Sequence, residues 1–189
     1  MVSGEVTALL DAVDAGDRDA MQALFTRVYD ELKQIARKRL AASAGNSLNT
    51  TGLVHEAYLK LAAPDAVPLH GRQHFFALAA KAMRQIVIDR ARARTADKRG
   101  GANVHITDLD AAVNVANTEL GPDELMRING ALDLLESAEP QLAQLVEMRF
   151  FAGLSIGEIA SLREQSERTL NREWRRAKAH LFATLHPET

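Results

Sequence analysis

The residues with the clearest chemical potential gather near the end of the chain, at spacings that place them on one face of a helix. They carry hydroxyl, carboxylate, amide and guanidinium groups, at Ser166, Glu167, Arg168, Asn171, Arg172 and Arg175. Arginine and asparagine can make paired hydrogen bonds to base edges, while hydroxyls and further arginines bind phosphates. At the same period the chain turns other side chains inward, Thr169 partly and Leu170, Trp174, Ala177 and Leu181 fully. This pattern is typical of a helix that contacts DNA.

The elements that would position these residues are a short helix over 155–162, a tight turn near Glu164 and Gln165, and a longer helix over about 166–185. Ser155 and Ser166 stand where the two helices begin, and serine accepts hydrogen bonds from free backbone N–H groups there. Such a pair forms a helix-turn-helix, whose second helix fits the major groove. A charged surface helix that ends a four-helix bundle would show the same pattern.

A second group of cations lies on a helix expected over about 73–94. Its core face is apolar, with Phe76, Ala79, Ala80, Met83, Ile86 and Val87. Its polar stripe consists of Lys81, Arg84, Gln85 and Arg92. The segment before it, 64–71, holds two prolines and a glycine and is expected not to be helical.

Helical periodicity extends over most of the remaining chain. It predicts further helices at 6–13, 24–40, 53–61, 122–135 and from Pro140 until Gly153, whereas 95–121 shows no clear period. The expected fold class is therefore all-α, with two small helical domains at 1–95 and 121–189 joined by a flexible linker at 96–120.

Charge is unevenly distributed, although the formal net charge is only −2. Cations dominate 81–99 and the chain from Arg163 onward, whereas acids dominate 108–139. Two basic blocks around an acidic middle suggest two surfaces that face phosphate. Such blocks are also typical of ordinary solvated helix faces. The positions of the charges in the fold must decide between phosphate binding and simple solvation.

Composition and short motifs exclude several classes of function. A hydrophobic fraction of 47% with 25% charged residues is typical of a globular chain rather than a disordered one. The sequence has no cysteine, no secretory signal and no apolar run long enough to span a membrane, so we expect a cytoplasmic protein. His55-Glu56 begins a zinc-protease motif, but Leu59 stands where the second histidine belongs. We therefore expect no enzyme activity, metal, cofactor or small-molecule substrate.

Longer stretches resemble bacterial RNA polymerase sigma factors of the extracytoplasmic-function (ECF) type. Residues 150–160 (FFAGLSIGEIA) and 166–175 (SERTLNREWR) are similar to the domain that reads the −35 promoter element. Residues 53–61 (LVHEAYLKL) resemble the polymerase-binding helix, and 74–94 resemble the helix that reads the −10 element. The similarity covers nearly the whole chain, in order and with matching spacing.

The resemblance implies partners and sites. The partners are core RNA polymerase, through its β′ clamp helices and β subunit, and promoter DNA. Polymerase binding is expected at Asn49, Thr51, His55, Glu56 and Lys60. Contacts to −10 DNA are expected at Arg72, Gln73, Lys81, Arg84 and Arg92, and contacts to −35 DNA at the six residues named first.

The start of the polymerase-binding helix departs from the family pattern. Many relatives carry a cluster of acids there, whereas this chain reads Asn49-Thr50-Thr51-Gly52 and keeps only Glu56 nearby. The segment resembles a subgroup associated with Ser/Thr protein kinases. Phosphate at Thr51, or at Thr50 as second choice, would replace the missing charge at a helix N-terminus. The alternative is that Thr51 is simply a helix cap.

The turn of the helix-turn-helix is a second departure. Relatives often have a Leu-Gly-Ile turn where this chain has Arg163-Glu164-Gln165. Without glycine, the turn must avoid positive φ or accept strain.

Two other functions remain open from the residues alone. A stand-alone helix-turn-helix regulator would bind duplex DNA without polymerase and would usually dimerise. A phosphorylation-controlled adaptor would use the N-terminal helices only, and it would give no reason for the basic stripe at Lys81, Arg84 and Arg92.

Overall fold

The computed structural model describes residues 2–17, 19–24, 26–27, 50–61, 71–97 and 120–187. Regular structure in these residues is helical throughout, which confirms the expected all-α class. The helices are α1 (Val2–Asp14), α3 (Thr50–Leu61), α4 (Gly71–Asp97), α6 (Pro122–Ala138), α7 (Pro140–Phe150), α8 (Ile156–Arg163) and α9 (Glu167–Leu185). Most of the helix expected over 24–40 and nearly all of the non-helical segment expected over 64–71 lie outside the described residues. No helix within them is long and apolar enough to cross a membrane.

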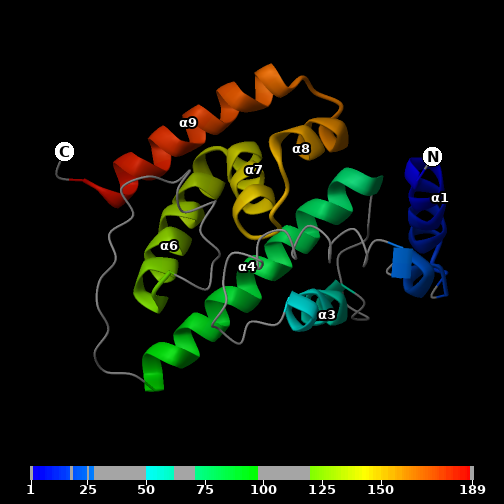
Figure 1. Ribbon diagram of the computed structural model, residues 1–189, viewed down its shortest axis with the longest axis horizontal. Helices are drawn as coiled ribbons and strands as arrows, with labels where there is room; N and C mark the ends of the chain where they lie inside the picture. Colours follow the sequence, from blue (N-terminus) through cyan, green and yellow to red (C-terminus); the bar gives the residue numbers. More distant parts are fainter. Residues whose placement is uncertain are drawn as a thin grey trace.

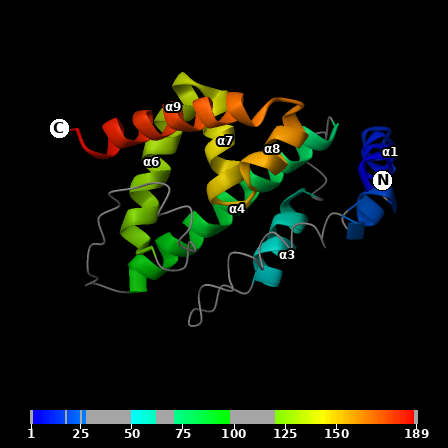
Figure 2. The same ribbon diagram turned by 45° about the horizontal axis from the view of Figure 1, so that its top comes forward.

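The long helix α4 is the centre of the fold. Figures 1 and 2 show α3 on one side of it and α6 and α7 on the other. Helix α9 lies across α6 and α7, and α8 connects α9 to the neighbourhood of α4 (Figure 1). Helix α1 packs against α4 as well. The candidate DNA-binding helix α9 is therefore held on a layer of helices that itself rests on α4.

The apolar pattern of α4 explains its central place. The predicted core face is confirmed, because all six of its apolar residues are buried. Phe75, Ala82 and Ile88, which lie off that face, are buried too. A helix covered on opposite sides must be apolar around more of its circumference than one amphipathic stripe. Periodicity alone predicted one covered side, and the structure has two.

The two predicted domains share one hydrophobic core. A continuous cluster of buried residues joins α4 to α6, α7, α8 and α9. Helix α4 ends at Asp97, two residues beyond the expected domain boundary at 95. Residues 98–119, nearly all of the expected linker, lie outside the described residues, so the linker stays a prediction.

Local signals fix where several helices start and stop. Gly16 follows α1 with a φ of 89°, a conformation that glycine adopts without strain. The next helical stretch is capped by Asp17, whose carboxylate accepts hydrogen bonds from the backbone N–H groups of Asp19 and Ala20 at 2.9 and 3.1 Å. Pro122 and Pro140 stand at the first positions of α6 and α7, where no backbone donor is needed.

Candidate nucleic-acid and polymerase interfaces

The helix-turn-helix predicted from the sequence is present as α8 and α9. Ser155 Oγ accepts from the backbone N–H of Glu158 at 3.2 Å, and the Glu158 carboxylate accepts from the Ser155 N–H at 2.7 Å. This reciprocal capping box fixes the start of α8. Ser166 Oγ accepts from the Thr169 N–H at 3.1 Å and caps α9. Both predicted serine caps are confirmed.

The turn between the two helices accepts the strain that the missing glycine implies. Glu164 adopts the left-handed conformation with a φ of 53°, and no other described non-glycine residue has positive φ. A side chain in this conformation costs roughly 1–2 kcal/mol. The direction in which α9 leaves the turn therefore depends on a backbone conformation that glutamate at position 164 disfavours.

Replacing Glu164 with glycine is expected to stabilise the protein. Relief of the left-handed strain is offset in part by the greater freedom that glycine gives the unfolded chain, which leaves a gain of about 0.5–1 kcal/mol. Urea denaturation followed by circular dichroism measures the change. Gln165→Gly, next in the chain and without positive φ, is the control and should lower stability instead. Equal effects of the two glycines would contradict the strain at Glu164.

Arg163 holds the helix-turn-helix to its support, a role the sequence analysis missed. Its side chain is buried, and Nη2 donates to the Gln141 carbonyl oxygen at 3.2 Å and to Gln144 Oε1 at 3.4 Å. Its Nη1 lies 3.5 Å from a carboxylate oxygen of Glu173 on α9. Burial lowers the pKa of Arg163, and the charge of Glu173 opposes that shift. One side chain thus joins α7, α8 and α9, and the available signal was an arginine at a turn position where the resembled family often has leucine.

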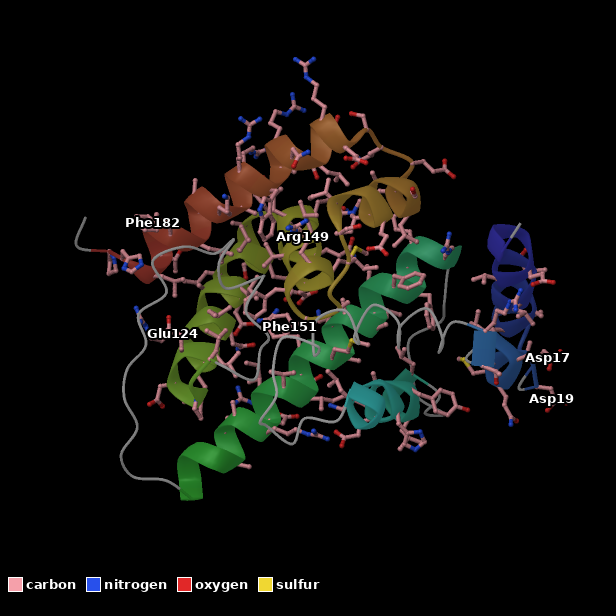
Figure 3. The ribbon with its side chains drawn as sticks, viewed as in Figure 1. Asp17, Asp19, Glu124, Arg149, Phe151 and Phe182 are labelled. Atoms are coloured by element: carbon pink, nitrogen blue, oxygen red, sulfur yellow. The ribbon has the colours of Figure 1, made fainter. Side chains whose placement is uncertain are left out.

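The two faces of α9 divide as the sequence predicted. Leu170, Trp174, Ala177 and Leu181 are buried, and Thr169 is partly buried. The Arg149 guanidinium of α7, labelled in Figure 3, lies 4.6 Å from the centre of the Trp174 ring. The candidate residues on the other face are all exposed, at Ser166, Glu167, Arg168, Asn171, Arg172 and Arg175. The structure brings these six side chains together on one open surface.

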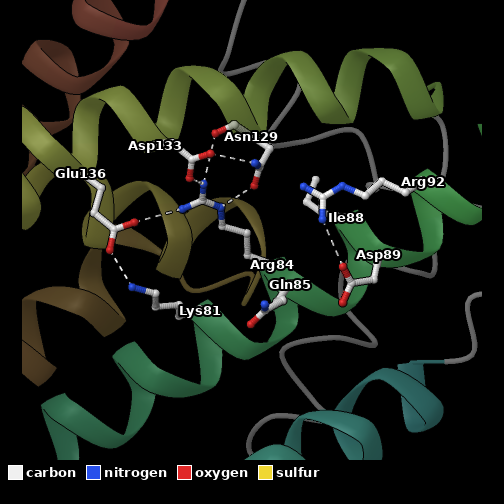
Figure 4. Close-up of a pocket in the computed structure, with 9 residues that line it drawn as sticks. All are labelled: Lys81, Arg84, Gln85, Ile88, Asp89, Arg92, Asn129, Asp133 and Glu136. Carbon is white, nitrogen blue, oxygen red and sulfur yellow. Dashed lines mark hydrogen bonds and ion pairs between the residues drawn. The ribbon is translucent and has the colours of Figure 1, made fainter.

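The candidate −10 residues of α4 are less uniform. Lys81 and Arg84 both reach acids of α6 (Figure 4), but the Lys81 side chain stays 55% exposed whereas Arg84 is enclosed. Lys81 Nζ lies 2.6 Å from Glu136 Oε1, and Arg84 is only 5% exposed. Arg84 belongs to the polar stripe of α4, yet it is buried, because acids from a distant part of the sequence cover it.

Arg84 makes a dense set of charged and polar contacts. Its Nη2 lies 2.5 Å from Asp133 Oδ1, its Nη1 lies 2.7 Å from Glu147 Oε1, and its Nε donates to Asn129 Oδ1 at 2.9 Å. Glu136 is a further carboxylate at 3.5 Å from Nη1. We call Lys81, Arg84, Asn129, Asp133, Glu136 and Glu147 the Arg84 cluster.

The carboxylates of the Arg84 cluster differ in environment. The hydrogen bond from Lys81 lowers the pKa of Glu136, which sits at the rim. Burial raises the pKa of Glu147, and the hydrogen bond from Arg84 only opposes this shift. Glu136 is therefore stabilised as an anion, whereas the charge of Glu147 is costly and depends on Arg84.

The remaining −10 candidates lie elsewhere on α4. Arg92 is exposed, 3.4 Å from Asp89, and lines the same pocket of about 240 Å³ as Lys81 and Arg84. Arg72 and Gln73 lie in the first turn, where the Arg72 guanidinium stands 5.6 Å from the centre of the Phe76 ring. The structure thus gathers three of the five candidates and leaves two at the other end of the helix.

The polymerase-binding candidates centre on α3, which begins at Thr50 and has no acid in its first turn. His55 and Lys60 are exposed, and Lys60 Nζ lies 3.8 Å from Asp89 Oδ2. Glu56, the one acid of α3, forms an ion pair with Arg90 of α4. Asn49 lies outside the described residues.

Among the described residues, no group of three or more His, Asp or Glu side chains is placed to hold a metal ion. What remains is an all-helical framework with a capped helix-turn-helix that exposes arginine and asparagine. These are the fold and the site of a helix-turn-helix DNA-binding protein.

Comparison with known proteins narrows this class. The sequence matches the ECF sigma factor family over residues 3–187, and the chain belongs to that family. No curated protein and no solved structure matches the chain. Membership assigns the protein a sigma factor's role in promoter-specific transcription initiation, with core RNA polymerase and promoter DNA as partners.

Proposed function

We propose that this sigma factor divides promoter recognition between α9, which reads the −35 element, and α4, which contacts the −10 element. The observation that carries the assignment is the exposed face of α9, where Arg168, Asn171 and Arg172 are free of the core. The proposal keeps the domain boundaries at 1–95 and 121–189. The protein then works in the cytoplasm, at the nucleoid when polymerase holds it.

Docking on core polymerase falls to α3 and depends on phosphorylation of Thr51, with Thr50 as second choice. Two observations support this part of the proposal. Helix α3 starts without an acid, and its single carboxylate, Glu56, is paired with Arg90. A phosphate in the first turn would supply negative charge where a helix N-terminus favours it. The partner that adds it is a Ser/Thr protein kinase.

Run-off transcription tests the proposal. Purified core polymerase, the protein and DNA from upstream of the neighbouring operon are combined with and without a Ser/Thr kinase. We expect a discrete transcript that needs the protein and increases with the kinase. Specific binding to duplex DNA without polymerase, and no transcript in either reaction, would instead identify a stand-alone helix-turn-helix regulator.

Replacing Arg172 with alanine is expected to reduce transcription roughly tenfold, because one lost base contact costs about 1–3 kcal/mol. Arg176→Ala is the matched control, since Arg176 is exposed on the same helix but pairs with Glu139 at 2.6 Å. Each variant is assayed on promoters with an intact and a scrambled −35 element. Equal losses for both variants, or a loss that ignores the −35 sequence, would contradict the assignment of α9.

A further inference from the structure

Glu167 is the single acid among the candidate DNA contacts of α9. It is the first residue of the helix, and its side chain is exposed. Its carboxylate makes no hydrogen bond or ion pair within the described residues. An anion on a surface that faces phosphate weakens binding to the DNA backbone. Glu167 therefore opposes DNA binding unless its carboxylate finds a hydrogen-bond donor on the bases.

The structure gives this carboxylate a defined place against the first turn of α8. A Cβ atom added at Gly157 would stand 3.0 Å from Glu167 Oε1 and 3.7 Å from its Cδ, so the carboxylate fills the space that a side chain at position 157 would take. Helices α8 and α9 pack side by side here (Figures 1 and 2). Glycine within a helix is unfavourable relative to alanine, and at this position it makes room for Glu167.

The donors that a carboxylate can meet in the major groove are exocyclic amino groups. Cytosine presents its N4 amino group there, whereas guanine and thymine present acceptors that repel an anion. Adenine presents an amino group too, but its N7 acceptor lies beside it. A carboxylate held at the start of α9 therefore favours cytosine over the other three bases.

We propose that Glu167 determines specificity by accepting a hydrogen bond from the N4 amino group of a cytosine in the −35 element, and that Gly157 positions its carboxylate for this contact. The proposal rests on the proposed function of α9 and deepens it, because it names a base that the helix selects. The arginines of α9 then supply most of the affinity, and Glu167 supplies discrimination at one position.

Run-off transcription from a template library measures the base preference. The DNA from upstream of the neighbouring operon is prepared with its −35 region randomised and with a barcode in the transcribed part that identifies each template. Core polymerase transcribes the library with the parent protein or a variant, and the barcodes in the transcripts are counted. The parent should prefer cytosine about tenfold at one position, the discrimination typical of one base contact.

Substitutions at Glu167 should change this preference in two different ways. Glu167→Ala should lose it, because no acceptor remains. Glu167→Gln should shift it toward adenine, because a glutamine amide can pair with both N6 and N7 of that base. Glu164→Gln is the matched control, since it removes the same charge from an exposed position in the adjoining turn. It should leave every base preference unchanged.

Gly157→Ala tests the positioning. The added methyl group would displace the Glu167 carboxylate by a few tenths of an ångström. The preference for cytosine should fall to about threefold, because hydrogen bonds weaken when their geometry is displaced. Gly130→Ala makes the same change in α6, where the new Cβ would meet no neighbour within 4 Å, and it should keep the parent's preference.

The outcomes separate this inference from the proposed function. A parent that selects bases in the −35 region, together with Glu167→Ala that keeps every preference, would overturn the inference and leave the proposed function of α9 intact. A loss of the cytosine preference in Glu164→Gln as large as in Glu167→Ala would overturn it as well, because net charge would then explain the effect. An unchanged preference in Gly157→Ala would contradict the positioning role of Gly157. A parent that selects no base at any position would overturn the proposed function of α9 and the inference with it.

Discussion

Replacing Arg84 with methionine is expected to lower the free energy of unfolding by about 3–5 kcal/mol, the range found when one partner of a buried ion pair is removed. The cause is the carboxylate left behind rather than the lost attraction. Glu147 is 4% exposed, and burial already raises its pKa while Arg84 opposes the shift. Without Arg84 the charge of Glu147 has no buried counter-ion. Urea denaturation followed by far-ultraviolet circular dichroism gives the change.

A double replacement separates the two causes. Methionine at both Arg84 and Glu147 removes the stranded charge together with its partner, and such apolar replacements of buried pairs are often neutral or stabilising. We expect the double variant to recover most of the loss. Asp133→Asn, at an exposed member of the Arg84 cluster, should cost about 1 kcal/mol or less. A double variant as unstable as Arg84→Met would mean that packing, rather than charge, sets the cost.

The deficit of Arg84→Met is also expected to depend on pH. A carboxyl group whose pKa is raised on folding favours the folded state when protonated, and this contribution is lost as the pH rises through the folded-state pKa. Removing Arg84 raises the pKa of Glu147 further, because the opposing interaction disappears. The gap between parent and variant should therefore be largest near neutral pH and shrink toward the ordinary carboxyl pKa of 4.5. A stability difference that does not change with pH would show that ionisation of Glu147 is not the cause of the loss.

Sequence reasoning succeeded where the signals are local. Ser155 and Ser166 each cap a helix through hydrogen bonds within three residues, and the inward face of α9 follows from period alone. The strained turn at Glu164 was also foreseeable, since the missing glycine left only two possibilities. These features can be predicted without knowing which helices pack against one another.

Sequence reasoning failed where a polar side chain is bound by residues that are distant in the sequence. Arg84 has the spacing of a solvated residue, yet it is buried by Glu147, which follows 63 residues later. Arg163 stands beside a turn and is buried by α7 on one side and α9 on the other. Period and residue type describe one helix at a time, whereas burial of an arginine depends on which carboxylates the fold brings to it.

The second large effect is expected at the proposed polymerase contact on α3, where the two nearest acids are already ion-paired. Glu56 is drawn onto Arg90, and Asp89 is shared by Arg92 and Lys60. Helix α3 therefore offers polymerase no acid that is not already paired within the described residues. The proposed docking of α3 on the polymerase clamp therefore needs negative charge from another source, and a phosphate in the first turn would supply it.

Phosphorylation of Thr51 is expected to raise the affinity for core polymerase roughly 100-fold. A phosphate adds about −1.5 to −2 charges and forms one to three charge-assisted hydrogen bonds, and 100-fold corresponds to about 2.7 kcal/mol. Thr51→Glu adds a single charge and should gain about tenfold, while Thr51→Ala should stay weak and ignore the kinase. Affinity is measured by titrating labelled protein with core polymerase.

The control must add the same charge away from α3, and Thr26→Glu does so at an exposed position. A gain with Thr26→Glu as large as with Thr51→Glu would reduce the effect to net charge. A gain with Thr50→Glu alone would move the modification by one residue, to the first residue of α3. Tight binding by unmodified protein and by Thr51→Ala would rule out the switch, because α3 would then dock without added negative charge. The deciding quantity is therefore the difference between modified and unmodified chains at one position, measured against the same charge placed elsewhere.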